Sequence, residues 1–442
     1  MSTGFYWDER CFWHGGGDYA VTFPLGGHVQ PLAAGGLAEN PETKRRLKNL
    51  MDVTGLSGEL AMRQAPAADW HDLARVHPEE FLLKFKQLSD QGGGELGLRT
   101  PFMKGGFEIA ALSAGLAKAA LFDVLRGDLD NAYALSRPPG HHCLPDWPNG
   151  FCLLNNIAIA IEAAKAAGLA QRFAVVDWDV HHGNGTEAIF LDRDDVLTIS
   201  LHQEWNYPLD TGELSQRGSG QGEGFNMNIP LPPGVGHNGY IETMERIVLP
   251  ALARFKPDVI IVACGFDASI YDMLSRMMCT PETFRVMTRQ VMQAADDLCD
   301  GRLAMVHEGG YSEVYVPFCG HAVLEELSGS TLQAEDPMAE TVKARQPNAR
   351  FDAFISGLIG EMAADLLGYC ASDPERGSKG IWHIEFGQCP CPAIFGHFAG
   401  CFGDDIDQLF MTSVVGERFQ IPPNEGETNH VFQRLNFGIF LD

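Results

Sequence analysis

Four short segments of this chain combine acids, imidazoles and a tyrosine in patterns that could perform metal-assisted chemistry. The strongest is the segment 177–185, which follows the apolar run 173–176. Side chains alternate along an extended chain, so Asp177, Asp179 and His181 share one face, and Asp179 and His181 can reach one metal ion. Burying such carboxylates without a cation or donors costs several kcal/mol. The alternative is that the two acids only cap a loop.

A third metal ligand is predicted at Asp267, which follows the apolar run 259–264. A single acid at the end of a strand is ordinarily the N-cap of a helix. Beside Asp179 and His181 it completes three protein ligands, a number typical of a catalytic zinc site with one open position. Because two carboxylates offset the charge of the ion, a bound water should be less acidic than in an all-histidine site. A neighbouring general base is then needed.

The adjacent imidazoles of His141 and His142 could supply that base. Two prolines stiffen the approach to them, and Gly140 permits close backbone contact. A lone histidine in such a place is more often a satisfied core residue. A histidine pair beside three acids favours a tuned acid–base dyad.

Tyr311 follows two glycines at the end of the apolar run 303–307. The glycines would form a turn that could present the tyrosine hydroxyl as a donor to a developing oxyanion. The alternative is an exposed tyrosine in a loop.

The elements that must position these residues form an alternating α/β pattern from about residue 105 to 320. Continuous apolar strands separated by helices indicate a parallel sheet covered on both faces. Ligands of such sheets bind beyond the carboxyl ends of the strands, where all four segments lie. A helix should begin at Asn40, whereas residues 1–30 are expected to form irregular loop. The predicted helices are 107–125, 155–167, 238–255 and 280–301, and the predicted strands are 131–136, 173–176, 196–201, 258–264 and 303–307.

Composition limits the partners and the compartment. The chain has 442 residues, with 58 Asp and Glu against 32 Lys and Arg, a net charge of −26. Such a surface repels phosphate backbones, so no nucleic-acid partner is expected; it suits cationic substrates or simply keeps the protein dissolved. No run approaches the roughly 18 apolar residues of a membrane span, and the first residues lack a signal-peptide pattern. The 11 cysteines, mostly in apolar runs, indicate reduced thiols and a cytoplasmic protein.

Taken together, the motifs resemble the histone deacetylase superfamily, and most of all its class II-like bacterial histone deacetylase-like amidohydrolases. The resemblance covers about residues 1–368. It implies an arginase-deacetylase fold, with a central eight-stranded parallel sheet and helices on both faces, in a domain of residues 1–370. The segment 371–442 is an appendage whose fold the sequence does not indicate. The motifs are Arg137-Pro138-Pro139-Gly140-His141-His142, Gly150-Phe151-Cys152, Asn155-Asn156, the segment 177–185, Ser200-Leu201-His202, Gly265-Phe266-Asp267-Ala268 and Glu308-Gly309-Gly310-Tyr311.

The resemblance implies hydrolysis of an acylated amine, typically Nε-acetyl-lysine, at one Zn²⁺ per chain bound by Asp179, His181 and Asp267. Fe²⁺ stays open, because Asp/His sites admit both metals. A module that binds acyl-lysine without hydrolysing it is another hypothesis. The complete set of expected catalytic residues argues against it.

The resemblance also assigns roles around the metal. His142 is the implied general base and later the acid toward the leaving amine, while His141, held by Asp177, stays more cationic. Tyr311 and the zinc polarise the acyl carbonyl. Asn184 stands where class I relatives have Asp, and a neutral partner raises the pKa of His142 less than a carboxylate would. A neutral His142 near pH 7 is therefore expected.

A substrate tunnel lined by two aromatic residues is implied as well, since methylene groups of a lysine stem pack on ring faces. Phe151 matches one of them, and Tyr207 stands where Phe is usual. Gly150 and Gly309 are expected beside the substrate. Leu274 falls at the mouth of the tunnel, where acetylpolyamine specialists carry an acid. This apolar gate argues against a polyamine substrate, although the net charge keeps an acetylpolyamine amidohydrolase as the alternative.

Structural K⁺ sites and assembly complete the implied features. One K⁺ site involves backbone oxygens around Asp177, Asp179 and Leu201 together with Ser200. Bacterial relatives commonly form homo-oligomers, which leaves a homo-oligomer open for this chain. A second K⁺ site is predicted near Phe190, Arg193, Val196 and Phe225.

Overall fold

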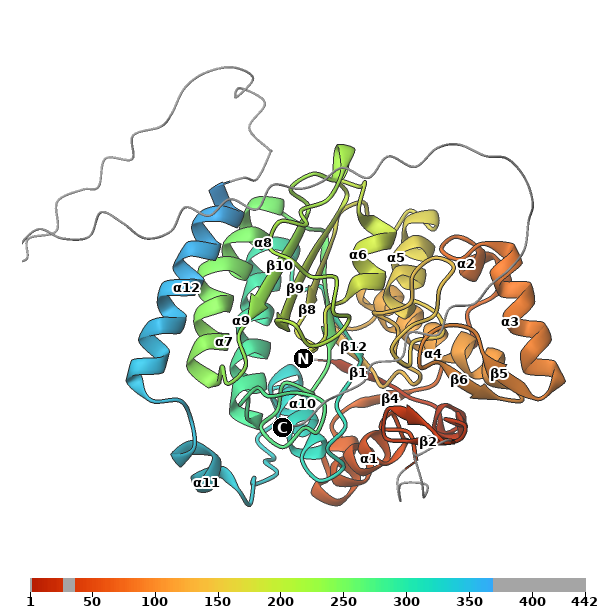
Figure 1. Cartoon of the computed structure of the whole chain (residues 1–442), viewed down its shortest axis with the longest axis horizontal. Helices are drawn as coiled ribbons and strands as arrows, with labels where there is room; N and C mark the ends of the chain where they lie inside the picture. Colours follow the sequence, from red (N-terminus) through yellow and green to blue (C-terminus); the bar gives the residue numbers. More distant parts are fainter. Residues whose placement is uncertain (1, 27–35, 369–442) are drawn as a thin grey trace, which may run out of the picture. The chain divides into compact units, whose positions relative to one another are not determined.

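The computed structural model describes residues 2–26 and 36–368, so the predicted appendage 371–442 lies outside the described residues. A single eight-stranded sheet forms the centre, in the order β10-β9-β8-β11-β12-β7-β1-β4, and all its strand pairs are parallel (Figure 1). The predicted eight-stranded parallel sheet is thereby confirmed. Its strands are β1 (Thr3–Tyr6), β4 (Ala61–Arg63), β7 (Asn131–Ala134), β8 (Phe173–Asp177), β9 (Val196–Gln203), β10 (Asn226–Leu231), β11 (Val259–Cys264) and β12 (Leu303–His307).

Helices cover both faces of this sheet, as Figure 1 shows, with α4, α5 and α6 on one side and α7, α8, α9, α10 and α12 on the other. Their bounds are α1 (Glu42–Thr54), α2 (Trp70–Ala74), α3 (Glu79–Gln91), α4 (Gly106–Leu125), α5 (Asn156–Ala166), α6 (Asn184–Phe190), α7 (His237–Thr243), α8 (Leu249–Phe255), α9 (Pro281–Cys299), α10 (Val316–Ser328), α11 (Ala339–Ala344) and α12 (Ala349–Gly368). A π-helical stretch, Met244–Val248, joins α7 to α8. Two short antiparallel pairs, β2 (Tyr19–Ala20) with β3 (Phe23–Pro24) and β5 (Gly93–Glu95) with β6 (Pro101–Met103), lie outside the sheet.

The buried strands divide their side chains between two apolar layers. Val175 of β8 and Ile261 of β11 pack with residues of α4 and α5, whereas their chain neighbours Val176 and Val262 pack with α9 and α10. This alternation explains why the central strands are apolar at nearly every position, since neither face meets water. It also holds the strand ends, and the segments that follow them, in fixed positions.

The expectation that residues 1–30 form irregular loop is wrong for Thr3–Tyr6, which forms β1 between β7 and β4. Phe5 and Tyr6 are buried there. Four residues are too few to show a strand period in a segment rich in Gly and aromatic residues. The predicted helix after Asn155 is confirmed as α5, and the side-chain oxygen of Asn155 accepts a hydrogen bond from the backbone N–H of Ala158 at 2.9 Å.

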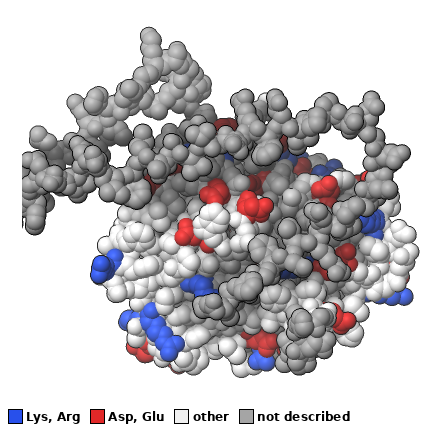
Figure 2. Space-filling view, in the orientation of Figure 1, with Lys and Arg blue, Asp and Glu red and all other residues white. Residues whose placement is uncertain are grey.

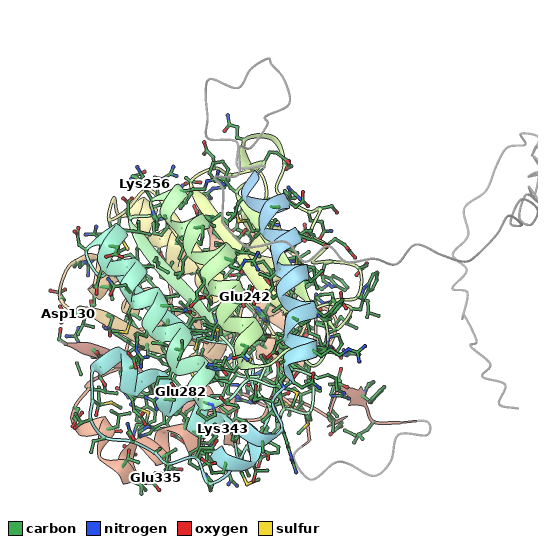
Figure 3. All side chains as sticks on the ribbon, turned by 90° about the vertical axis from the view of Figure 1, so that its left-hand side faces the viewer. Asp130, Glu242, Lys256, Glu282, Glu335 and Lys343 are labelled. Atoms are coloured by element: carbon green, nitrogen blue, oxygen red, sulfur yellow. The ribbon has the colours of Figure 1, made fainter. Side chains whose placement is uncertain are left out.

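The surface carries both signs of charge. On the face in Figure 2, acidic and basic residues lie among uncharged ones. Figure 3 views the side covered by α7, α9 and α12, where Glu242, Glu282 and Lys343 lie at the surface. Within the described ranges, no helix is long and apolar enough to cross a membrane.

Candidate active site

The residues of the predicted site follow four neighbouring strands at one edge of the sheet. β8, β11, β12 and β7 are adjacent, and the segments with the predicted ligands, bases and tyrosine follow their carboxyl ends. After β8 the chain continues to β9 on one side of the sheet, and after β11 it continues to β12 on the other side. Open parallel sheets usually bind ligands beyond the carboxyl ends of two such strands. The four segments therefore lie together at this edge of the sheet.

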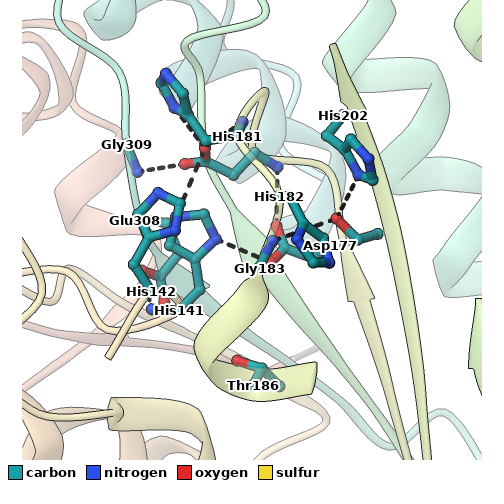
Figure 4. Close-up of polar contacts among 12 residues, drawn as sticks. His141, His142, Asp177, His181, His182, Gly183, Thr186, His202, Glu308 and Gly309 are labelled. Carbon is teal, nitrogen blue, oxygen red and sulfur yellow. Dashed lines mark hydrogen bonds and ion pairs between the residues drawn. The ribbon is translucent and has the colours of Figure 1, made fainter. Parts of the chain in front are cut away.

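The three predicted metal ligands converge there, all buried. The Nδ1 atom of His181 lies 3.0 Å from Oδ2 of Asp267 and 3.2 Å from Oδ1 of Asp179. One ligand atom from each residue lies within 4.8 Å of the other two. The backbone N–H groups of Val180 and Gly309 donate to Asp267 at 2.8 Å and to Asp179 at 2.7 Å. Figure 4 shows His181 and Gly309 in this arrangement.

This group fits a divalent cation. Burial, and then the charge of Asp179, raise the pKa of Asp267 to about 6, which a cation between the two acids would relieve. Among the described residues, no Lys or Arg forms an ion pair with either carboxylate. A Cβ atom at Gly309 would lie 2.2 Å from Oδ2 of Asp267 and 2.6 Å from Oδ2 of Asp179, so glycine leaves the space between the acids free. Two carboxylates and an imidazole suit Zn²⁺ or Fe²⁺.

His141 and His142 lie next to each other near His181, as Figure 4 shows, and their hydrogen-bond partners differ. Nδ1 of His141 is 2.9 Å from Oδ2 of Asp177, and Nδ1 of His142 is 2.8 Å from Oδ1 of Asn184, in the first turn of α6. Their ring centroids are 4.0 Å apart. This geometry places both rings in one buried cluster, and their action as an acid–base dyad stays a prediction.

Their pKa values move in opposite directions. Burial alone would lower the pKa of His141, but the charges of Asp179 and Asp177 raise that pKa well above its ordinary value. Burial and the charge of His141 hold the pKa of His142 well below its ordinary value. Neighbouring groups with separated pKa values are how acid and base roles are divided in active sites.

Two buried acids outside the predicted set hold the surrounding loops. Glu308 accepts hydrogen bonds from the backbone N–H groups of Gly140 at 2.7 Å and His141 at 3.1 Å. Asp272 accepts from the N–H of Tyr311 at 2.7 Å and of Leu274 at 2.8 Å. Burial raises the pKa of both carboxyls to about 7. The only signal in the sequence was an acid beside the glycine pair and another in the turn before Leu274.

A cavity of about 130 Å³ reaches this cluster from the surface. The rings of Phe151 and Tyr311 are 5.7 Å apart, and those of His142 and Tyr207 are 5.2 Å apart. The hydroxyl of Tyr207 donates to the side chain of Asn149. A Cβ atom on Gly150 would approach His142 to 2.5 Å, so this position keeps the cavity open beside the ring. The lining residues are Thr22, Arg99, His142, Gly150, Phe151, His181, Asn206, Tyr207, Leu274 and Tyr311.

The residues of the first predicted K⁺ site also meet. Asp177 at the end of β8 is the register partner of Ser200 in β9, and Leu201 follows. The Ser200 hydroxyl lies 2.9 Å from Nδ1 of His202.

The residues of the second predicted K⁺ site lie toward the amino ends of β9 and β10, away from the ligands. The carbonyl of Phe225 accepts the N–H of Thr198 at 3.0 Å, and the carbonyl of Phe190 accepts that of Arg193 at 3.1 Å. Val196 is the first residue of β9. K⁺ at either place stays a prediction.

Comparisons with known proteins show the family to which this chain is related. Residues 37–327 match the model of the histone deacetylase domain. The chain is 55% identical to a histone deacetylase-like amidohydrolase of Pseudomonas aeruginosa over 377 residues, 85% of this chain and 99% of that protein. It is 38% identical to a probable deacetylase of Archaeoglobus fulgidus over 301 residues, 67% of this chain and 83% of that protein.

Among solved structures, a crystal structure of the HDA15 HD domain aligns with a TM-score of 0.71 and 31% identity, covering 84% of this chain and 98% of that one. Fold and matches define the class as an α/β protein with the arginase-deacetylase fold. The chain belongs to the histone deacetylase family. It is a hydrolase that acts on amides, as the resemblance implied.

Proposed function

We propose that this chain is a zinc-dependent deacylase that hydrolyses the amide of Nε-acetyl-lysine, or of a similar acylated amine, to a free amine and a carboxylate. The observation that carries the proposal is the convergence of Asp179, His181 and Asp267 beside His142 at the inner end of the cavity. When bound by these three residues, Zn²⁺ would act as a Lewis acid toward the acyl carbonyl and the attacking water.

In this proposal His142 moves the protons. Its Nδ1–H donates to Asn184, which leaves Nε2 as the free basic atom. A neutral His142 takes a proton from the attacking water and returns it to the leaving amine. His141, kept cationic by Asp177 and Asp179, stabilises the negative charge that develops nearby.

Tyr311 supplies the hydrogen bond to the oxyanion. Burial and the charge of Asp267 hold the pKa of its hydroxyl well above the ordinary value, so the group stays a donor at neutral pH. Asp272 holds the backbone of Tyr311, which fixes the ring at the cavity wall. A positioned donor of this kind acts mainly in the transition state.

The cavity fits an aliphatic stem. The rings of Phe151 and Tyr207 line it beside Gly150, and Leu274 adds an apolar side chain to the lining. Gly309 donates its N–H to Asp179 and leaves space between the acids.

An acetylpolyamine amidohydrolase is the second candidate, favoured by the net charge of −26. Among the described residues, no Asp or Glu lines the cavity to receive a second ammonium group.

The test compares acetyl-lysine peptides with acetylputrescine and acetylspermidine, using the full chain loaded with zinc or with iron. We expect acetate release with the higher kcat/KM on peptides. A strong preference for acetylated polyamines would make the acetylpolyamine amidohydrolase the first candidate. If a fully zinc-loaded sample released acetate from no acylated amine, a module that only binds acyl-lysine would become the better proposal.

We further propose structural K⁺ at the Asp177 and Ser200 site, and at the second site near Phe190 and Phe225, and a cytoplasmic location. A rise in melting temperature with K⁺ but not Li⁺ tests the first part. The mass in solution tests whether the chain forms a homo-oligomer.

A further inference from the structure

The rim of the active-site cavity carries one unexpected charge. Arg99 is the only Lys, Arg, Asp or Glu among the described residues that line the cavity, and it is half-buried. Its guanidinium lies 5.3 Å from the centre of the Tyr207 ring, so the cation rests against a wall of the cavity. A substrate that enters along Tyr207 must pass close to this charge.

The backbone of Arg99 is tied to the cavity wall. Its carbonyl accepts the N–H of Phe151 at 3.0 Å, and the carbonyl of Leu98 accepts the N–H of Gly150 at 3.1 Å. Arg99 adopts φ 59°, a left-handed conformation that costs free energy for a residue with a side chain. These bonds keep the start of the side chain in place beside the two residues that line the cavity.

Within the part of the chain that the structure describes, the guanidinium of Arg99 forms no ion pair with a carboxylate. Glu95, the acid of the same loop, instead accepts the Tyr19 hydroxyl at 2.8 Å and the backbone N–H of Thr100 at 3.0 Å. The net charge of −26 acts over longer distances and is screened beyond about 8 Å at physiological salt. Among the described residues, Arg99 is therefore the Lys, Arg, Asp or Glu side chain that a substrate in the cavity meets directly.

We propose that Arg99 determines specificity, selecting acylated amines that carry a carboxylate close to the acylated stem and disfavouring those with a second ammonium group. The inference rests on the proposed deacylase function. A guanidinium matches a carboxylate with two parallel N–H donors, which a lysine cannot do. The carboxylate could belong to an acidic residue beside acyl-lysine in a peptide, or to the α-carboxylate of free acyl-lysine.

The test measures kcat/KM for acetyl-lysine peptides that differ only in a flanking Glu, Gln or Lys, and for Nε-acetyl-lysine with a free or amidated carboxylate. We expect the wild type to prefer the Glu peptide over the Lys peptide by about 10-fold at low salt, mainly through KM, and the preference to fade with added salt. A higher kcat/KM for Nε-acetyl-lysine with a free carboxylate than with an amidated one would identify the α-carboxylate as the group that Arg99 recognises. A higher kcat/KM only for the peptide with a flanking Glu would identify the acidic side chain instead.

Variants separate the local charge from the total charge. Arg99→Gln should remove most of the Glu-over-Lys ratio, Arg99→Glu should invert it, and Arg99→Lys should keep part of it. Arg350→Gln is the matched control, since Arg350 is exposed on α12 and does not line the cavity. A ratio that is unchanged in Arg99→Gln and Arg99→Glu, or equally reduced in Arg350→Gln, would overturn the inference. Failure of the wild type on the neutral Gln peptide would instead count against the proposed function.

Discussion

His141 and His142 are adjacent in the chain, yet their surroundings move their pKa values in opposite directions. Both are buried, so burial favours the neutral form of each. His141 faces the carboxylate of Asp177, whereas His142 faces the amide of Asn184. The carboxylate beside His141 thus helps to keep that imidazole cationic, and the amide beside His142 helps to leave that imidazole neutral.

Asn184→Asp should change the pH dependence of the proposed reaction. A carboxylate in place of the Asn184 amide, beside Nδ1, would raise the pKa of His142. His142 then stays protonated to higher pH, so the acid limb of the kcat/KM profile should move to higher pH. The profile of each protein at equal zinc content checks this. An unmoved acid limb would remove His142 as the base that titrates.

Tyr311→Phe should lower kcat by about 10²- to 10³-fold while zinc content stays stoichiometric, because one oxyanion donor is lost. Tyr315→Phe is a matched control, since the Tyr315 hydroxyl donates to Asp336 at 2.7 Å and does not line the cavity. Single-turnover kinetics with metal analysis make the comparison. Wild-type turnover of Tyr311→Phe would exclude the tyrosine from the mechanism.

Gly309→Ala should release the metal, because the added Cβ would lie 2.2 Å from Oδ2 of Asp267. Gly357→Ala, on α12 with nothing within 4 Å of an added Cβ, should keep it. Zinc content after dialysis distinguishes them. A full complement of zinc in Gly309→Ala would show that the two acids do not hold the ion in this geometry.

The residues that the sequence identified are those whose chemistry is visible in their own side chains, such as Asp179, His181 and Tyr311. Glu308 and Asp272 escaped assignment because their partners are backbone N–H groups of distant loops. Their function depends on which loops meet, and residue type alone does not indicate that. Arg99 escaped for the same reason, since only the folded loop brings it against Tyr207.

At the level of elements, the apolar runs predicted β8, β11 and β12, but their order in the sheet comes from long-range pairing. The order places β11 and β12 between β8 and β7. This insertion brings the four segments of the site together. β1, β4 and β10 were missed, because the first two have only four and three residues and all three lie toward the edges of the sheet.

A buried histidine that links elements around α5 should make stability depend on pH. Nδ1 of His77 lies 2.8 Å from the carbonyl of Pro145, and Nε2 accepts the N–H of Asn155, the cap of α5, at 3.0 Å. Burial lowers the pKa of His77 to about 4. The unfolded chain therefore binds a proton first, below about pH 6.5, and stability falls as pH drops from there toward 4.

Between pH 7.5 and 4.5 the contribution of His77 to this loss should be about 2–3 kcal/mol. Denaturant unfolding of the wild type and of His77→Gln at both pH values measures it, and the variant should lose less by that amount. Equal losses in the two proteins would show that His77 does not stay neutral in the folded state.

For the molecule as a whole, the family match extends over residues 37–327, and the residues that line the cavity extend from Thr22 to Tyr311. We keep residues 1–370 as the proposed catalytic domain. Its centre is a sheet whose two faces are fully covered, so that only the edge beyond the strand ends remains for chemistry. The acidic net charge belongs to the whole surface, whereas substrate choice is expected to follow the few groups at the cavity rim.

The most direct measurement is anomalous diffraction at the zinc edge from crystals of the zinc-loaded protein, with zinc content measured in solution for Asp267→Ala. We expect one ion per chain, about 2.0–2.2 Å from a carboxylate oxygen of Asp179, Nδ1 of His181 and a carboxylate oxygen of Asp267, and loss of zinc from the variant. An ion held by Asp179 and His181 with the Asp267 carboxyl out of bonding reach, or stoichiometric zinc in Asp267→Ala, would contradict the proposed site.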